Sequence, residues 1–349
     1  MKNLKSREIR LKKRPNGMPD ASCFELAETS VPEPKKGEIL VRNSFMSVDP
    51  YMRGRMVERE SYVPPFQIGE PLSGHAVGQV IASESPNFKV GDFVTHMLGW
   101  REVSLVGSDP IAQLTTMKID PGLAPLPAYL GTLGMPGLTA YAGLLRVGAL
   151  KDGETVFVSA ASGAVGTVVC QIAKNKGCYV VGSAGSDDKC DWLKKEARVD
   201  ATINYKNFKD EAALTAEVKR LFPKGIDVYF ENVGGAHLNA ALANMRLKGR
   251  IAMCGMIAQY NDTALPPGPS NIIAAIPLSL RLEGFIVSNH YDMVGDFMRD
   301  MGGWIKAGKM KWHETVMDGI DKAPEAFLGL FKGANFGKMV VKVGPEKAV

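Results

Sequence analysis

The fold is decided by the stretch Thr155-Val156-Phe157-Val158-Ser159-Ala160-Ala161-Ser162-Gly163-Ala164-Val165-Gly166. Residues 155–158 are β-branched or aromatic, which predicts a short buried strand. Small residues follow, and residues 167–174 then have the apolar spacing of a helix that ends at Gly177. A strand, a tight turn and a helix present free backbone N–H groups and the helix dipole to a pyrophosphate. The stretch therefore predicts a dinucleotide site.

The spacing Ala160-x-x-Gly163-x-x-Gly166 differs from the Gly-x-Gly-x-x-Gly pattern because an alanine stands first. The alternative is a turn whose small residues only let a helix pack closely on a sheet. A second strand follows at the right distance, and its end carries residues that bear on the choice of nucleotide. This context favours the nucleotide site.

Composition favours a soluble globular protein of two domains. The chain has 349 residues, of which 45% are hydrophobic and 23% charged, and no apolar run is long enough to span a bilayer. The first residues are basic but lack the apolar core of a signal peptide, so we expect a cytoplasmic location. The five cysteines form no Cys-x-x-Cys pair, which disfavours a disulfide framework and a clustered zinc site.

The net charge of +5 does not indicate a nucleic-acid-binding surface. Residues 1–14 carry seven basic side chains and one acidic side chain, so the remaining chain is close to neutral. Binding across a folded face would need a broad basic surface there. We expect neither a nucleic-acid partner nor a membrane partner.

Residues 1–125 read as a β domain, because short alternating strands are separated by Pro and Gly turns. Two stretches in it could carry chemistry. The segment 47–53 places Asp49, Tyr51 and Arg53 beside a proline-fixed turn, and Gly74-His75-Ala76-Val77-Gly78 is close to a ligand motif of zinc alcohol dehydrogenases. Ser47 stands where a first Cys ligand is expected, so we predict no metal and a structural, hydrogen-bonded His75.

The middle of the chain alternates strand and helix patterns. This alternation predicts parallel strands with right-handed crossovers, which form a doubly wound sheet. Strands are expected at 155–158, 179–182, 201–204, 226–231, 250–254 and 282–287, and helices at 167–174, 189–195, 210–221, 236–244 and 293–306.

The end of the second strand indicates NADP(H) rather than NAD(H). NAD enzymes usually place an acid there for the ribose 2′-OH, whereas this chain has Val181-Gly182-Ser183-Ala184-Gly185-Ser186 and then Lys189. Small residues leave room for a 2′-phosphate, and the lysine offers it a positive charge. The alternative is an exposed lysine at a helix start that Asp187 and Asp188 cap. The two interpretations are compatible, because they use different side chains.

Together these residues resemble the zinc-independent medium-chain dehydrogenase/reductases, in the branch of prostaglandin reductases, leukotriene hydroxydehydrogenases and curcumin reductases. The resemblance spans nearly the whole chain and rests on the segments 47–53, 134–141, 160–166, 230–235, 254–261 and 335–338. It implies a Rossmann domain at 126–307 and a discontinuous GroES-like β-barrel domain at 1–125 and 308–349. It also implies NADPH-dependent reduction of the carbon–carbon double bond of α,β-unsaturated ketones and aldehydes.

The resemblance also implies roles for individual residues. Lys189 and Tyr205 would contact the adenosine phosphate, Phe285 to Val287 with Asn335 the nicotinamide amide, and Tyr260 the nicotinamide ribose and the substrate carbonyl. Tyr51 would line the opposite wall, and Pro266-Pro267-Gly268-Pro269 would cover the substrate. The full expected cofactor set is Ala160, Gly163, Ala164, Val165, Gly166, Ser186, Lys189, Tyr205, Asn232, Cys254, Tyr260, Phe285, Val287 and Asn335.

The implied reaction needs a hydrogen-bond donor for the enolate oxygen and no covalent nucleophile. We predict Tyr260 as the first donor and Tyr51 as the second. The alternatives are a Tyr260 that only shapes the pocket and a Tyr51 that only packs at its turn. The sequence leaves open whether a tyrosine or water protonates the α-carbon.

Two other functions compete with this one: a quinone reductase of the same fold, and an NADPH-binding sensor without turnover. The tyrosines and the proline-rich segment favour catalysis. The resemblance further implies a homodimer in which the last strand of each nucleotide domain pairs with its copy.

Overall fold

The computed structural model describes residues 4–107, 112, 115–264 and 266–349. The chain forms two compact units: Met1–Leu130 with Glu314–Val349, and Gly131–His313. The sequence-based domain limits, after residues 125 and 307, lie a few residues from these borders and remain a prediction.

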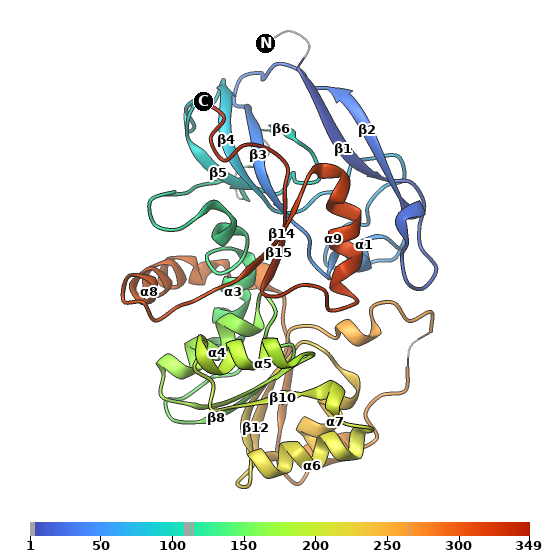
Figure 1. The fold of residues 1–349 in the computed structure, drawn as a ribbon, viewed down its shortest axis with the longest axis vertical. Helices are drawn as coiled ribbons and strands as arrows, with labels where there is room; N and C mark the ends of the chain where they lie inside the picture. The colour runs from blue at the N-terminus through green and yellow to red at the C-terminus, as the bar shows by residue number, and fades with distance from the viewer. Residues whose placement is uncertain (1–3, 108–111, 113–114, 265) are drawn as a thin grey trace. The chain divides into compact units, whose positions relative to one another are not determined.

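The first unit is built around a seven-stranded sheet that is antiparallel except for one pair (Figure 1). Strand β3 pairs with three other strands. Along one edge it pairs with β4; along its other edge the first half of β3 pairs with β6 and the second half with β15. A separate hairpin joins β1 (Lys5–Leu11) to β2 (Phe24–Ser30). The strands of the sheet are β3 (Ile39–Ser47), β4 (Ala76–Ser83), β5 (Phe93–His96), β6 (Val103–Val106), β7 (Met117–Lys118), β14 (Glu314–Asp318) and β15 (Lys338–Lys342).

The C-terminal segment completes the core of the first unit. Helix α9 (Ala323–Leu330) places Phe327 edge-on against Trp100 and Phe24, with ring centroids 6.1 Å apart in both pairs. Trp100 and Phe24 stack at 6.2 Å, and the side chains of Trp100 and Phe327 are fully buried. A short helix α1 (Met52–Arg55) follows the turn at Pro50. Residues from both ends of the chain therefore share one core.

The second unit holds a six-stranded parallel sheet in the order β10-β9-β8-β11-β12-β13. Counted from β8, this is the order 3-2-1-4-5-6 of a doubly wound dinucleotide-binding sheet, so that predicted fold is confirmed. The strands are β8 (Thr155–Val158), β9 (Tyr179–Ala184), β10 (Ala201–Asn204), β11 (Ile226–Glu231), β12 (Met245–Met253) and β13 (Arg281–Gly284).

Helices cover both faces of this sheet: α4 and α5 lie on one face, and α6 and α7 on the other (Figure 1). Val156, Phe157 and Val158 of β8 are fully buried because they lie between these layers. The helices of this unit are α3 (Met135–Ala142), α4 (Gly166–Asn175), α5 (Asp187–Lys195), α6 (Glu211–Leu221), α7 (Gly235–Leu242) and α8 (Val294–Lys306).

Two strands differ from the sequence-based expectation. Strand β12 begins at Met245 rather than at Arg250, since its first half is largely exposed and contains a left-handed Lys248, which hides the strand pattern. Strand β13 ends at Gly284 because Val287 begins a 3₁₀ helix, η7 (Val287–Met293).

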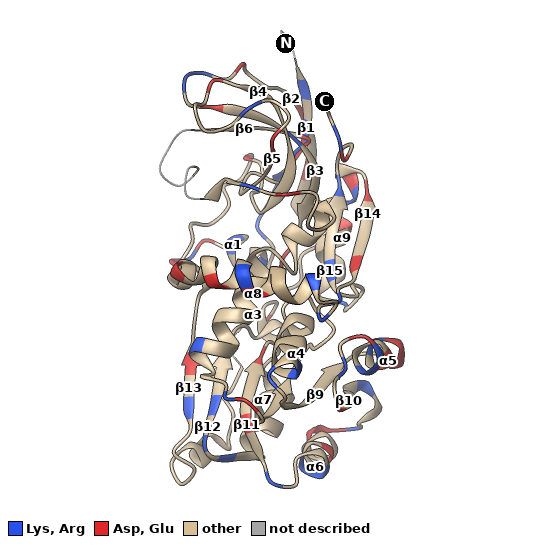
Figure 2. Ribbon diagram, turned by 90° about the vertical axis from the view of Figure 1, so that its left-hand side faces the viewer, with Lys and Arg blue, Asp and Glu red and all other residues tan. Residues whose placement is uncertain are grey.

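Acidic and basic residues both lie on α5, α6 and α8 (Figure 2). None of the helices in the described part of the chain combines the length and apolar content needed to cross a bilayer.

Candidate cofactor-binding site

The carboxyl ends of the parallel strands bring most of the predicted cofactor residues to one edge of the sheet. In a doubly wound sheet, ligands bind outside these ends, near the point where the strand order reverses. Here that point lies between β8 and β11, which are hydrogen-bonded neighbours. The residues that follow the strands are Ala160 to Gly166 after β8, Ser186 after β9, Tyr205 after β10, Asn232 after β11, Cys254 after β12 and Phe285 after β13.

The turn after β8 is tight and held by its own backbone. Ala160 adopts a left-handed conformation with φ of 46°, which an L-residue reaches only at an energetic cost. The Gly163 N–H donates to the Ala160 carbonyl at 2.9 Å, and the Thr167 N–H donates to the Gly163 carbonyl at 3.0 Å. A Cβ on Gly166 would overlap the same Ala160 carbonyl, so this position requires glycine.

The turn also leaves backbone donors for a ligand. Among the hydrogen bonds of the described residues, none uses the N–H groups of Ala164, Val165 or Gly166. Helix α4 begins at Gly166, so its positive dipole end lies at these donors. Three neighbouring N–H groups at a helix start fit a pyrophosphate, which supports the predicted dinucleotide site.

We predict that Gly166→Ala weakens NADPH binding and lowers the free energy of unfolding by about 1–3 kcal/mol, the usual cost of overpacking. The added Cβ must displace the Ala160 carbonyl and with it the turn. Calorimetric titration and urea unfolding measure the two effects. Gly303→Ala is the control, because Gly303 lies in α8 of the same unit and a Cβ there meets no atom within 4 Å. Unchanged NADPH affinity in Gly166→Ala would contradict the assigned role of the turn.

Asn232 and Glu231 fasten the turn after β8 to the end of β11. The Asn232 side chain donates to the Ser159 carbonyl at 2.8 Å, and its backbone N–H donates to Ser159 Oγ at 2.9 Å. Oε1 of the buried Glu231 accepts from the N–H groups of Val233 and Gly234 at 2.6 and 2.9 Å. Glu231 therefore fixes the entrance to α7, a role that sequence reasoning missed; the only signal is a charged residue at the end of an apolar strand.

The ends of β9 and β10 form the predicted adenosine side of the site. A Cβ on Gly185 would lie 2.9 Å from the Tyr205 hydroxyl, so this phenol lies directly over the start of α5. Burial and the nearby Lys206 lower the pKa of Lys189. Two lysines therefore accompany Tyr205, of which the sequence predicted only Lys189. Ser186 is the N-cap of α5, and Asp187 and Asp188 lie in the first turn of this helix. The alternative interpretation of Lys189, in which these two aspartates cap the helix, is therefore wrong about the capping residue.

The segment after β12 places Tyr260 close to the backbone of its own turn. The Met256 N–H donates to the Tyr260 phenol oxygen in a long hydrogen bond of 3.4 Å, and a Cβ on Gly255 would lie 2.8 Å from that oxygen. The Cys254 N–H donates to the Glu231 carbonyl at 3.0 Å. Burial raises the pKa of the Cys254 thiol to about 12, which leaves it an uncharged, unreactive group.

Phe285 packs edge-on against Phe230 and His290, at centroid distances of 6.2 and 5.9 Å. Val287 begins η7, two residues further along the chain.

The predicted cover over the substrate, residues 266–269, contains neither helix nor strand. The preceding residue, Leu265, lies outside the described residues.

The first unit contains the remaining predicted residues, Tyr51 and Asn335. Tyr51 precedes α1, and burial together with Asp49 raises the pKa of its hydroxyl. The Asn335 side chain donates to the Gly337 carbonyl at 2.9 Å. Because the two units are described separately, the placement of Tyr51 and Asn335 at the cofactor remains a prediction.

Beside Tyr51 lies a buried ion pair that sequence reasoning missed. Lys338 Nζ lies 3.2 Å from Asp49 Oδ1 and donates to the carbonyls of Val48 and Met339, both at 2.8 Å. Ser47 Oγ donates to the other Asp49 oxygen. Sequence reasoning missed the pair because lysine at a strand start usually faces solvent.

His75 lies in the stretch that is close to a zinc-ligand motif. His75 accepts the Ser47 N–H through its backbone carbonyl at 2.8 Å, but its buried Nδ1 has no hydrogen-bond partner, so the predicted hydrogen bond is missing at this nitrogen. Within the described ranges, no three His, Cys, Asp or Glu side chains gather in a metal-binding arrangement.

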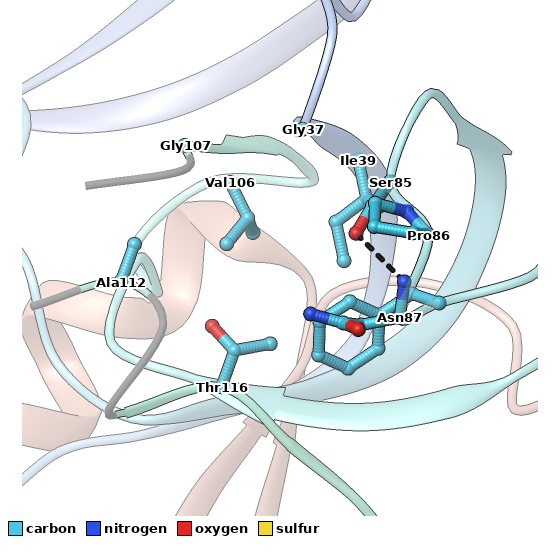
Figure 3. A pocket seen from close by; sticks show the side chains of 10 residues that line it. Gly37, Ile39, Ser85, Pro86, Asn87, Val106, Gly107, Ala112 and Thr116 are labelled. Atoms are coloured by element: carbon cyan, nitrogen blue, oxygen red, sulfur yellow. Dashed lines mark hydrogen bonds between the residues drawn. The ribbon is translucent and has the colours of Figure 1, made fainter. Parts of the chain in front are cut away.

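Figure 3 shows a pocket of about 200 Å³ in the first unit, between Ile39, Phe88 and Thr116. None of the predicted site residues lines it. Its wall at Gly107 and Ala112 adjoins residues outside the described ones.

Comparisons with known proteins agree along nearly the whole chain. Two family profiles match, one described as the N-terminal domain of oxidoreductase over residues 7–114 and one as zinc-binding dehydrogenase over residues 164–301. The NADP-dependent 2-alkenal reductase of Nicotiana tabacum is 46% identical over 98% of both chains. Prostaglandin reductase 1 of Rattus norvegicus is 44% identical over 95% of this chain and 97% of its own.

Solved structures agree with these relatives. CurA of Vibrio vulnificus in complex with NADPH has a TM-score of 0.89 and 39% identity, over 97% of this chain and 99% of its own. A quinone oxidoreductase of Escherichia coli complexed with NADPH has a TM-score of 0.77 over 96% of this chain and 99% of its own. At 20% identity the latter shows the fold alone.

Proposed function

The chain belongs to the medium-chain dehydrogenase/reductases, in the branch of alkenal, curcumin and prostaglandin reductases, and from this we propose that it reduces the carbon–carbon double bond of α,β-unsaturated ketones and aldehydes with NADPH. The observation that carries the proposal is the identity of 46% with an alkenal reductase over 98% of the chain. The donor turn at the start of α4 supports it independently.

The residues of the second unit suit NADPH. The N–H groups of Ala164, Val165 and Gly166 would bind the pyrophosphate, while Lys189 and Tyr205 would bind the 2′-phosphate. When bound, NADPH supplies a hydride to the β-carbon of the substrate. The chain then has to stabilise the negative charge that develops on the carbonyl oxygen.

Tyr260 is the donor we propose for that oxygen. The Met256 N–H donates to its phenol oxygen, and such a bond polarises the hydroxyl and strengthens it as a donor. Tyr51 is the second candidate, because its raised pKa keeps the hydroxyl protonated at neutral pH. Either hydroxyl could donate a hydrogen bond to the enolate oxygen.

A substrate panel tests this function against its two rivals. NADPH is mixed with the enzyme and with enones, enals or quinones, and the loss of NADPH absorbance is followed. We expect turnover with enones and enals. Turnover with quinones alone would favour a quinone reductase, and tight NADPH binding without any turnover would favour a sensor.

Lys189→Ala should narrow the preference for NADPH over NADH by about ten- to a hundredfold, since each charge-assisted hydrogen bond contributes about 1.5–3 kcal/mol. The ratio of kcat/KM for the two nucleotides measures it. Lys194→Ala is the control, because Lys194 lies on the same helix but is half exposed and pairs only loosely with Asp191, at 3.8 Å. An unchanged ratio in Lys189→Ala would contradict the proposal that Lys189 binds the 2′-phosphate.

We also propose a homodimer through the edge strand β13. Among the strands of the described residues, β13 pairs with β12 alone, and Ile273 and Ile276, just before it, are 69% and 77% exposed. An open strand edge next to exposed isoleucines favours pairing with a second copy. Ile276→Lys should therefore shift sedimentation toward a monomer, whereas Val349→Lys, at another exposed apolar residue, should not. A parent chain that sediments as a monomer would contradict the proposal.

A further inference from the structure

A buried histidine, His237, contacts Tyr205 on the predicted adenosine side of the site. His237 lies in the first turn of α7, and its Nε2 is 2.8 Å from Ser183 Oγ on β9. The side chains of both residues are at most 5% exposed. The His237 ring meets the Tyr205 ring edge-on, with centroids 5.2 Å apart and planes at 77°. Three elements, β9, α7 and the segment after β10, thus converge on one aromatic contact.

The two sides of the Tyr205 ring have different surroundings. Tyr205 is 39% exposed, so one part of its ring faces solvent while the other part rests on His237. Its hydroxyl lies over Gly185, directly before the start of α5. Because the nucleotide ribose binds after the second strand in this fold, the hydroxyl is where a 2′-phosphate would arrive.

The histidine itself is well suited to hold a ring and not to bind the anion. Burial lowers the pKa of His237 to about 4, so its imidazole is neutral near pH 7 and offers one donor and one acceptor. Ser183 engages one ring nitrogen, which fixes the plane of the imidazole. The orientation of α7 is set in turn by Glu231, which accepts the N–H groups of Val233 and Gly234.

We propose that His237 is a positioning residue for recognition of the nucleotide 2′-phosphate: held by Ser183, it keeps the Tyr205 phenol over Gly185, where the phosphate binds. This inference rests on the proposed function, since it assumes a nucleotide with a 2′-phosphate. A histidine that only fills the core would affect stability and not the choice between nucleotides.

Calorimetric binding of 2′,5′-ADP and 5′-AMP tests the proposal without any turnover, because the two probes differ only in the 2′-phosphate. His237→Ala and His237→Gln both lack the ring, and we expect each to bind 2′,5′-ADP about fivefold more weakly, with 5′-AMP changed less than twofold. His237→Phe retains a ring against Tyr205 but loses the hydrogen bond with Ser183, so it should recover part of the affinity. Equal losses for both probes, or no recovery by Phe, would overturn the proposal.

A double-mutant cycle shows whether His237 acts through Tyr205. In the Tyr205→Ala background, His237→Gln should cause no further loss of 2′,5′-ADP affinity, whereas an additive loss would contradict the mechanism. His96→Gln is the matched control, because His96 is equally buried and hydrogen-bonded to Asn43 in the other unit. It should lower stability and leave both affinities unchanged.

Binding of the two probes to the parent protein distinguishes failure of the proposed NADPH use from failure of the proposed role of His237. If it binds 2′,5′-ADP no better than 5′-AMP, the proposed use of NADPH fails, and the role of His237 fails with it. If it prefers 2′,5′-ADP and His237→Gln retains the full preference, only the role of His237 fails.

Discussion

Replacing Lys338 by methionine should lower the free energy of unfolding by about 3–5 kcal/mol, the usual cost of removing one partner of a buried ion pair. The three protons of the ammonium have three oxygen acceptors, on Asp49, Val48 and Met339. The side chains of Lys338 and Asp49 are 4% and 7% exposed, so water cannot replace the lost charge. The variant leaves the Asp49 carboxylate buried without a cation, and it removes the donor from the carbonyls of Val48 and Met339.

Urea unfolding followed by circular dichroism measures the loss. Lys342→Met is the matched control, since Lys342 also lies on β15 but is only half-buried. The double variant Asp49→Asn, Lys338→Met removes both charges and should recover part of the stability, because the penalty comes from the unpaired carboxylate. A loss below about 1 kcal/mol in Lys338→Met, equal to that of Lys342→Met, would contradict this account.

The sequence predicts the second unit well because its strands are buried on both faces. The run Val156 to Val158 and the alternation with helices follow directly from the apolar pattern, and the alternation predicts parallel strands with right-handed crossovers. The order of the strands comes from the structure. Once the order is known, residues far apart in the sequence must meet at the carboxyl edge. Asn232 and Ser159, which bond through side chain and backbone, illustrate this.

The parts that the sequence did not predict depend on side-chain geometry. Ala160 stands out as a departure from the glycine pattern, but its left-handed backbone is visible only in the structure. Likewise, the sequence does not reveal that Lys338 is buried or that His237 meets Tyr205, because both depend on pairing across elements. Polar contacts of this kind have no periodic signature, in contrast to the apolar face of a strand or helix.

Replacing Tyr260 by phenylalanine should lower turnover by about 10²–10³-fold, which corresponds to about 2.7–4 kcal/mol for loss of one donor to a developing oxyanion. The change removes the hydroxyl and keeps the ring that packs beside Gly255. NADPH affinity should change little, since the proposed phosphate contacts lie after β8, β9 and β10. Steady-state kinetics with an enone substrate and calorimetric titration of NADPH measure the two quantities.

A loss confined to kcat would separate the donor role of Tyr260 from a role in shaping the pocket, because a lost pocket wall would weaken substrate binding and raise KM instead. Tyr291→Phe controls for removal of a phenol elsewhere in the same unit, on the exposed face of η7. If Tyr260→Phe turns over as fast as the parent, the role passes to the second candidate. Tyr51→Phe should then show the large loss, since its buried hydroxyl is the other protonated donor that the sequence singled out.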